Sequence, residues 1–157
     1  MQNAFTCSPS NLIAQAMPKP DDATPKSGKA AHIAHVGIAV ESLSAILPFF
    51  RDVLQMPEVP LADSDGARIA AVESGESLIE FLEPAAPDTP IGKYLARRGP
   101  GIHHICVAVP DIHVALDRCR AAGIRIIDET PRRGAEGKLI AFLHPSSTGG
   151  VLVELSE

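Results

Sequence analysis

The stretch His35-Val36-Gly37-Ile38-Ala39-Val40 decides the fold, because the chain repeats its pattern as His104-Ile105-Cys106-Val107-Ala108-Val109. Both copies alternate larger apolar residues with small ones, a period of two that predicts a β-strand opened by a histidine. Successive side chains of a strand point to opposite faces, so each histidine shares its face with small residues. We therefore expect the face that carries His35 and His104 to border open space.

A glutamate closes each half of this repeat. Glu80 follows His35 by 45 residues, and Glu154 follows His104 by 50 residues. Leucines flank both glutamates, and a carboxylate among apolar groups costs roughly several kcal/mol unless it is paired or ligated. Two imidazoles and two carboxylates that converge would suit a divalent metal. The sequence therefore predicts a metal site formed by His35, Glu80, His104 and Glu154.

Helix signals follow the histidine-bearing strand in both halves. In the second half, Asp111 is a good N-cap and Gly123 a good terminator. In the first half, the helix is expected to begin near Ser44 or to kink at Pro48, because proline fits only the first turn of a helix. A short connecting helix is expected between the N-cap Thr89 and Gly99.

These signals together predict the architecture. The expected fold class is α+β, with two tandem βαβββ modules over about residues 31–88 and 100–157. The modules are expected to face each other across a cleft with a central metal site. His103 precedes His104, so its side chain is expected on the opposite face, in a structural role.

Length and composition fit one globular domain, expected over residues 31–157. The chain has 157 residues, of which 45% are hydrophobic. Residues 1–30 hold four prolines and predict a flexible N-terminal arm. A net charge of −5 argues against nucleic-acid binding, and no apolar run approaches the ~20 residues that span a membrane. Three cysteines without close pairing favour a reducing compartment, so we expect a cytoplasmic location, or the mitochondrial matrix in a eukaryote.

From about His32 to Glu157 the chain resembles the methylmalonyl-CoA epimerase family. This family lies within the vicinal-oxygen-chelate superfamily, which also includes glyoxalase I. The resemblance is carried by four stretches: Pro90-Ile91-Gly92-Lys93-Tyr94-Leu95, Gly101-Ile102-His103-His104-Ile105, Gly134-Ala135-Glu136-Gly137-Lys138, and Phe142-Leu143-His144-Pro145 with the following Thr148-Gly149-Gly150-Val151-Leu152-Val153-Glu154-Leu155. The histidines and glutamates alone would indicate only the superfamily and its glyoxalase-like fold.

The resemblance implies a racemase of propionate metabolism that inverts C2 of methylmalonyl-CoA between its R and S forms. It implies a metal held by His35, Glu80, His104 and Glu154; cobalt is expected first, with zinc, nickel or manganese as alternatives. Removal of the C2 proton leaves an enolate, whose charge a divalent metal would stabilise. Carboxylates near the metal are the natural proton carriers, so Glu80 is the first candidate for the catalytic base and Glu154 the second. A homodimer is expected.

Two positions depart from the family pattern. Some relatives carry a further glutamate three residues after a glycine, where this chain has Ile69 after Gly66. Isoleucine cannot carry a proton, so Glu80 would have to act as both ligand and base, or water or another side chain would supply the second proton. Glu136 also stands where many relatives have histidine.

The CoA part of the substrate carries phosphates, which need cations. Basic residues gather near the connecting helix and the 134–138 loop, and His144 is expected to line the cleft beside the last strand. The residues predicted to bind CoA are Lys93, Arg97, Lys138 and His144.

Three other functions fit the same superfamily. The first is a glyoxalase-type lyase acting on a glutathione thiohemiacetal, which also uses a metal and a carboxylate base. The second is a metal-free ligand-binding module of the drug-resistance type, against which the four ligands argue. The third is an extradiol dioxygenase, which uses iron with three protein ligands and is disfavoured by the fourth.

Overall fold

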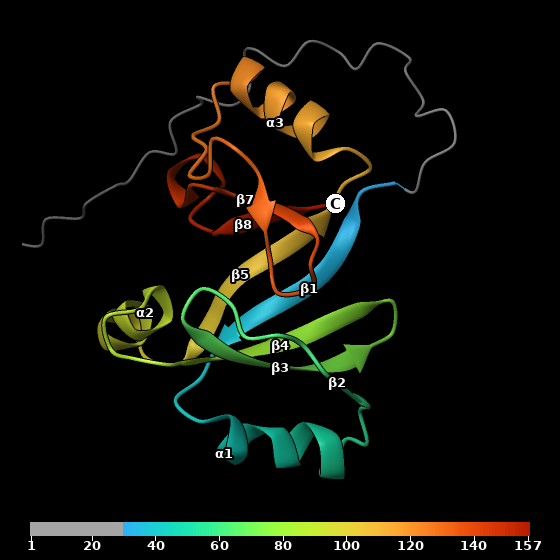
Figure 1. Cartoon of the computed structure of the whole chain (residues 1–157), viewed down its shortest axis with the longest axis vertical. Coiled ribbons are helices and arrows are strands. Elements are labelled where there is room, and N and C mark those ends of the chain that lie inside the picture. The colour runs from blue at the N-terminus through green and yellow to red at the C-terminus, as the bar shows by residue number, and fades with distance from the viewer. Residues whose placement is uncertain (1–29) are drawn as a thin grey trace, which may run out of the picture.

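The computed structural model describes residues 30–157, which form two βαβββ units joined by a helix (Figure 1). The first unit comprises β1 (His32–Ala39), α1 (Leu43–Pro48), a π-helical turn (Phe49–Val53), β2 (Glu58–Val59), β3 (Ala67–Ser74) and β4 (Ser77–Pro84). After the connecting helix α2 (Pro90–Arg98), the second unit comprises β5 (Gly101–Ala108), α3 (Ile112–Ala121), β6 (Arg132–Arg133), β7 (Leu139–Leu143), a 3-10 turn (Pro145–Ser147) and β8 (Val153–Ser156). The predicted α+β class and the repeated βαβββ order are confirmed. The predicted arm lies, except for its last residue, outside the described residues.

All eight strands form one mixed sheet, in the order β2-β3-β4-β1-β5-β8-β7-β6. The two histidine-bearing strands, β1 and β5, pair antiparallel at its centre, and each pairs in parallel with the glutamate-bearing strand of its own unit, β4 or β8. Figure 1 shows α1 and α3 at opposite ends of the molecule, with the curled sheet between them. This order brings the four predicted ligands to the centre of the sheet.

Each unit packs its helix against its own strands. In the second unit, Ile112 and Leu116 of α3 are fully buried against β7 and β8. The Asp111 carboxylate accepts a hydrogen bond from the Val114 N–H at 2.9 Å, and Gly123 follows the helix in the left-handed conformation with φ of 69°. The predicted start and end of this helix are therefore confirmed, as is the N-cap of α2 by the Thr89 hydroxyl.

The first-unit helix agrees with the prediction at its start and at its proline, but its cap comes from a distant residue. It begins at Leu43, and directly after Pro48 the α-helix gives way to the π-helical turn, so the disturbance expected at the proline is present. The Ser42 side chain makes no cap hydrogen bond. Instead, the Leu43 N–H donates to a carboxylate oxygen of Glu83 at 2.8 Å, and the first N–H of α3, that of Ile112, donates equivalently to Glu157 at 2.8 Å.

The two histidines do not open their strands, and this prediction was wrong. β1 begins at His32 and β5 at Gly101, so His35 and His104 lie three residues inside. The strands start earlier because His32 pairs with Ala108 and Gly101 pairs with Ala39 on the other central strand. Within residues 30–157, no helix is long and apolar enough to span a membrane.

Candidate metal centre and active site

The four predicted ligands converge in the structure. The Nε2 atoms of His35 and His104 lie 3.0 Å apart. Glu80 approaches His35 with Oε1 3.3 Å from Nδ1, and Glu154 approaches His104 with Oε2 3.3 Å from Nε2. All four side chains are buried, with at most 5% of each residue exposed. One strand of each unit supplies an imidazole and another a carboxylate.

The donor set fits a divalent metal. His35 Nδ1 and Glu80 Oε1 are buried without a hydrogen-bond partner, an arrangement that costs free energy unless another group occupies them. Ligand atoms of His35, Glu80 and His104 lie within 4.8 Å of one another, as do those of His35, Cys106 and Glu154. Imidazole nitrogens and carboxylate oxygens together suit first-row divalent ions.

The electrostatics of the four groups follow from burial and crowding. Burial lowers the pKa of His104 to about 3, and the charge of His35 acts in the same direction. Burial also acts to lower the pKa of His35, but the adjoining Cys106, Glu136 and Glu80 outweigh it and raise that pKa to about 10. Burial raises the pKa of Glu154 to about 7. Without a metal, the site therefore holds protons at neutral pH.

His103 lies on the cleft side of the sheet, and its predicted placement on the opposite face was wrong. A β-bulge separates the pair Gly37–His104 from the pair Ile38–Ile102, and His103 is the extra residue. The bulge turns its ring toward the site, where its Nδ1 lies 3.0 Å from Nδ1 of His104. In the tautomer with its proton on Nδ1, His104 donates to His103 and leaves Nε2 for a metal.

Glu136 is a third carboxylate beside the site and was not among the predicted ligands or bases. It lies in the turn between β6 and β7, with Oε1 3.6 Å from Nδ1 of His35, and forms an ion pair with Lys138. Its side chain is only 20% exposed. The sequence placed this loop near the substrate, but only the folded hairpin shows that the carboxylate reaches His35.

A cavity of about 290 Å³ opens above these groups, between the two units. Apolar side chains from both units make up much of its wall, including Ile69, Leu82 and Phe142. Ile69 therefore faces the cavity, at the position where some relatives place a glutamate. The cavity can enclose a small acyl group and exclude water from the buried histidines and carboxylates.

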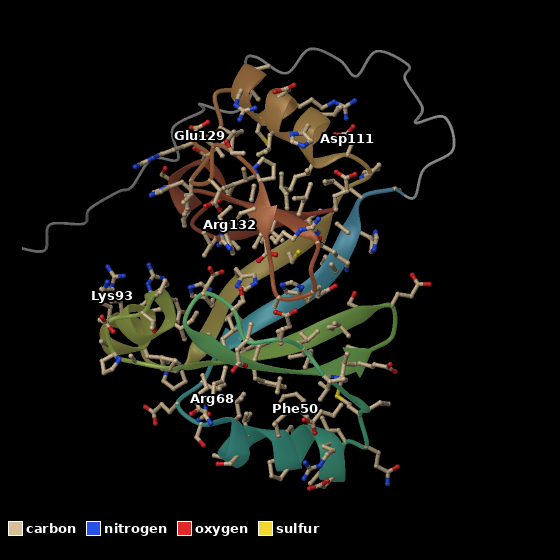
Figure 2. All side chains as sticks on the ribbon, in the orientation of Figure 1. Phe50, Arg68, Lys93, Asp111, Glu129 and Arg132 are labelled. Carbon is tan, nitrogen blue, oxygen red and sulfur yellow. The ribbon has the colours of Figure 1, made fainter. Side chains whose placement is uncertain are left out.

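Of the four residues predicted to bind CoA, Lys138 lines the cavity and the others lie elsewhere. Lys93 and Arg97 lie further along α2, whose first residues, Pro90 and Ile91, do line it. Figure 2 shows Lys93 on the outer side of α2. His144 caps the 3-10 turn, with its Nδ1 accepting a hydrogen bond from the Ser146 N–H at 3.0 Å. This hydrogen bond engages one of the two ring nitrogens of His144.

Comparisons with known proteins agree with this geometry. Residues 34–142 match the model of the Glyoxalase/Bleomycin resistance protein/Dioxygenase superfamily. The mitochondrial methylmalonyl-CoA epimerase of Bos taurus is 39% identical over 127 residues, which cover 78% of this chain and 72% of that protein. The chain belongs to the methylmalonyl-CoA epimerase family.

Two further relatives extend the comparison. The ethylmalonyl-CoA/methylmalonyl-CoA epimerase of Cereibacter sphaeroides is 38% identical, covering 78% of this chain and 95% of that protein. A variant of Streptomyces coelicolor methylmalonyl-CoA epimerase, solved in complex with 2-nitronate-propionyl-CoA, is 34% identical with a TM-score of 0.77, covering 82% of this chain and 94% of that chain. The epimerase prediction is supported, and the lyase, ligand-binding and dioxygenase alternatives are not.

Proposed function

We propose that the protein interconverts (R)- and (S)-methylmalonyl-CoA by moving a proton at C2. The observation that supports this most is the burial of Glu80 and Glu154 beside His35 and His104 where all four line one cavity. Buried carboxylates next to imidazoles can both ligate a metal and carry a proton. A divalent ion bound there would supply positive charge at the thioester oxygen, where negative charge develops when the C2 proton leaves.

We assign the proton transfers to the cavity's carboxylates. Glu80 is the first candidate for the base, because burial raises its pKa and one oxygen has no hydrogen-bond partner. Inversion requires a proton from the other face of C2, which Ile69 cannot supply. Glu136 enters the cavity from the second unit whereas Glu80 enters from the first, so we propose that Glu136 serves the other face. Glu154 is the second candidate for that role.

Solvent deuterium entering C2 of methylmalonyl-CoA tests this function directly. The wild-type protein loaded with metal is expected to exchange the C2 proton and to equilibrate the two epimers. Glu80→Gln should lower exchange by about 100-fold or more while metal stays bound, because an amide cannot accept the proton. The matched control is Glu76→Gln, an exposed carboxylate in the β3–β4 turn, which should exchange normally. Turnover of only the glutathione thiohemiacetal would contradict the proposal.

Several finer features belong to the same proposal. We propose cobalt as the preferred metal, with zinc, nickel or manganese as alternatives, and a role in propionate metabolism. We propose a homodimer in the cytoplasm, or in the mitochondrial matrix of a eukaryote. Lys93, Arg97, Lys138 and His144 are proposed to bind CoA. Lys138 lines the cavity, Lys93 and Arg97 lie further along α2, and His144 lies at the start of the 3-10 turn.

A further inference from the structure

Two permanent cations line the cavity within the described residues, and they differ in their surroundings. Lys138 is neutralised by Glu136 of the same turn. Arg132 of β6 instead reaches across to the first unit, where its Nη1 lies 3.0 Å from Oδ2 of Asp65. Asp65 belongs to the loop before β3 and also lines the cavity. The Arg132–Asp65 ion pair therefore joins the two units at the cavity wall.

A ligand carboxylate can displace Asp65 from Arg132. Both side chains are partly exposed, Arg132 to 36% and Asp65 to 48%, and exposed ion pairs contribute little to stability. Nε of Arg132 also lies 3.6 Å from a carboxylate oxygen of Asp128. Because a guanidinium carries five N–H groups, Arg132 can bind a further partner beside Asp128. The position of the Asp65 carboxylate thus shows where, in the cavity wall, a carboxylate can bind the Arg132 guanidinium.

The Arg132 guanidinium is linked to the predicted metal ligands through one aromatic ring. The guanidinium of Arg132 sits over the Phe142 ring at 5.8 Å from its centroid, and the same ring packs edge-on against His104 at 5.5 Å. Phe142 therefore lies in contact with both Arg132 and His104. Figure 2 shows Arg132 on the side of the second unit that faces the first. A small acyl group that lies over the histidines would bring a second polar group within reach of Arg132.

We propose that Arg132 binds the free carboxylate of the substrate's acyl group and thereby selects malonyl-type thioesters over simple acyl-CoA thioesters. This inference rests on the proposed function, because it takes methylmalonyl-CoA as the ligand. Asp65 occupies the guanidinium while the cavity is empty and yields it to the substrate. Planar, two-pronged pairing makes arginine more selective for a carboxylate than a lysine ammonium is.

The test compares two ligands that differ only in this carboxylate. Titration calorimetry measures binding of epimerically equilibrated methylmalonyl-CoA and of propionyl-CoA to the metal-loaded protein. Arg132→Met should weaken methylmalonyl-CoA binding by about tenfold or more, since a hydrogen-bonded charge pair is lost, and should change propionyl-CoA binding less than about twofold. Asp65→Asn should tighten methylmalonyl-CoA binding, because the competing charge is removed, and asparagine tolerates the left-handed φ of 53° found at this position.

Arg118→Met is the matched control, because it removes the same charge from the exposed side of α3. It should leave both affinities unchanged. Equal weakening of both ligands by Arg132→Met would overturn the proposal, since it would place Arg132 on the CoA part. Unchanged methylmalonyl-CoA binding in Arg132→Met, or no tightening in Asp65→Asn, would overturn it as well. Failure of the wild-type protein to exchange the C2 proton would instead refute the proposed function.

Discussion

His35 and Glu154 together should release about 1.5 protons at pH 7 when a metal binds, in addition to the share of Glu80, whose pKa burial also raises. Ligation requires neutral imidazoles and ionised carboxylates, so every proton held by the metal-free site must leave. His35, with its pKa raised to about 10, holds a full proton at pH 7, and Glu154, with its pKa raised to about 7, holds half of one. His104, with its pKa lowered to about 3, holds none.

The proton release fixes how metal affinity depends on pH. The metal-bound state binds fewer protons, so affinity must rise with pH. Between pH 6.5 and 7.5 a release of about 1.5 protons corresponds to an affinity gain of roughly 30-fold. Of His35 and Glu154, only His35 still holds its proton above pH 8, so their joint contribution to the gain falls to about tenfold per pH unit, and it ends once the pH passes the pKa of about 10.

Titration calorimetry with cobalt, in two buffers of different ionisation enthalpy, measures the released protons directly. Glu136→Gln provides a matched variant, because Glu136 is one of the groups that raise the pKa of His35. It should release fewer protons, while the share from Glu154 persists. Release of less than about half a proton at pH 7 from the wild-type protein, or an affinity that stays flat between pH 6.5 and 7.5, would refute the reasoning.

Three further predictions concern stability. Cobalt at about 1,000 times its Kd should stabilise the protein by about 4 kcal/mol, raising Tm by roughly 8–16 °C; a chelator should reverse the shift, and His104→Ala should not show it. In the metal-free protein, Glu154 and His35 have pKa values raised above their ordinary values of 4.5 and 6.5. The stability that protonated Glu154 provides is therefore lost as the pH rises through about 7, and the stability that protonated His35 provides is lost as the pH rises through about 10. Below pH 6.5 the lowered pKa of His104 acts in the opposite direction, so chelator-treated protein should melt at lower temperature as the pH is raised from 7 to 9, and a rising Tm over that range would contradict this. Asp111→Ala should cost about 1 kcal/mol in chemical denaturation because it removes the cap of α3, whereas Ser42→Ala, whose side chain makes no cap hydrogen bond, should cost almost nothing; equal losses would refute the distinction.

The sequence was sufficient to predict which four side chains meet, because alternation along a strand determines the face on which each residue lies. His35 and His104 lie on the cleft face as expected, and Glu80 and Glu154 lie on the neighbouring strands of the same sheet. Repetition strengthened the prediction, since one pattern located both halves. The expected ligand set therefore needed no knowledge of loop geometry.

The features that could not be predicted depend on register and on contacts between distant segments. A bulge inserts His103 as one unpaired residue, and strand alternation does not reveal where such an insertion falls. Glu136 and Arg132 reach the cavity through the short β6–β7 hairpin, whose direction follows from packing of the second unit against the first. The sequence also did not show that Nδ1 of His144 caps the 3-10 turn.

The antiparallel pairing of β1 with β5 places the site on the seam between the two halves. Each half contributes half of the proposed ligands, and each also supplies a glutamate, Glu83 or Glu157, that accepts a hydrogen bond from the first N–H of its own helix. A primitive chain of one such half could build the same cage by pairing with an identical copy about a twofold axis. Such a cage would accept a ligand equally well in either of two orientations. In a single chain each half can change alone, and Glu136 and Arg132, which belong to the second half only, make the two sides of this cleft chemically different.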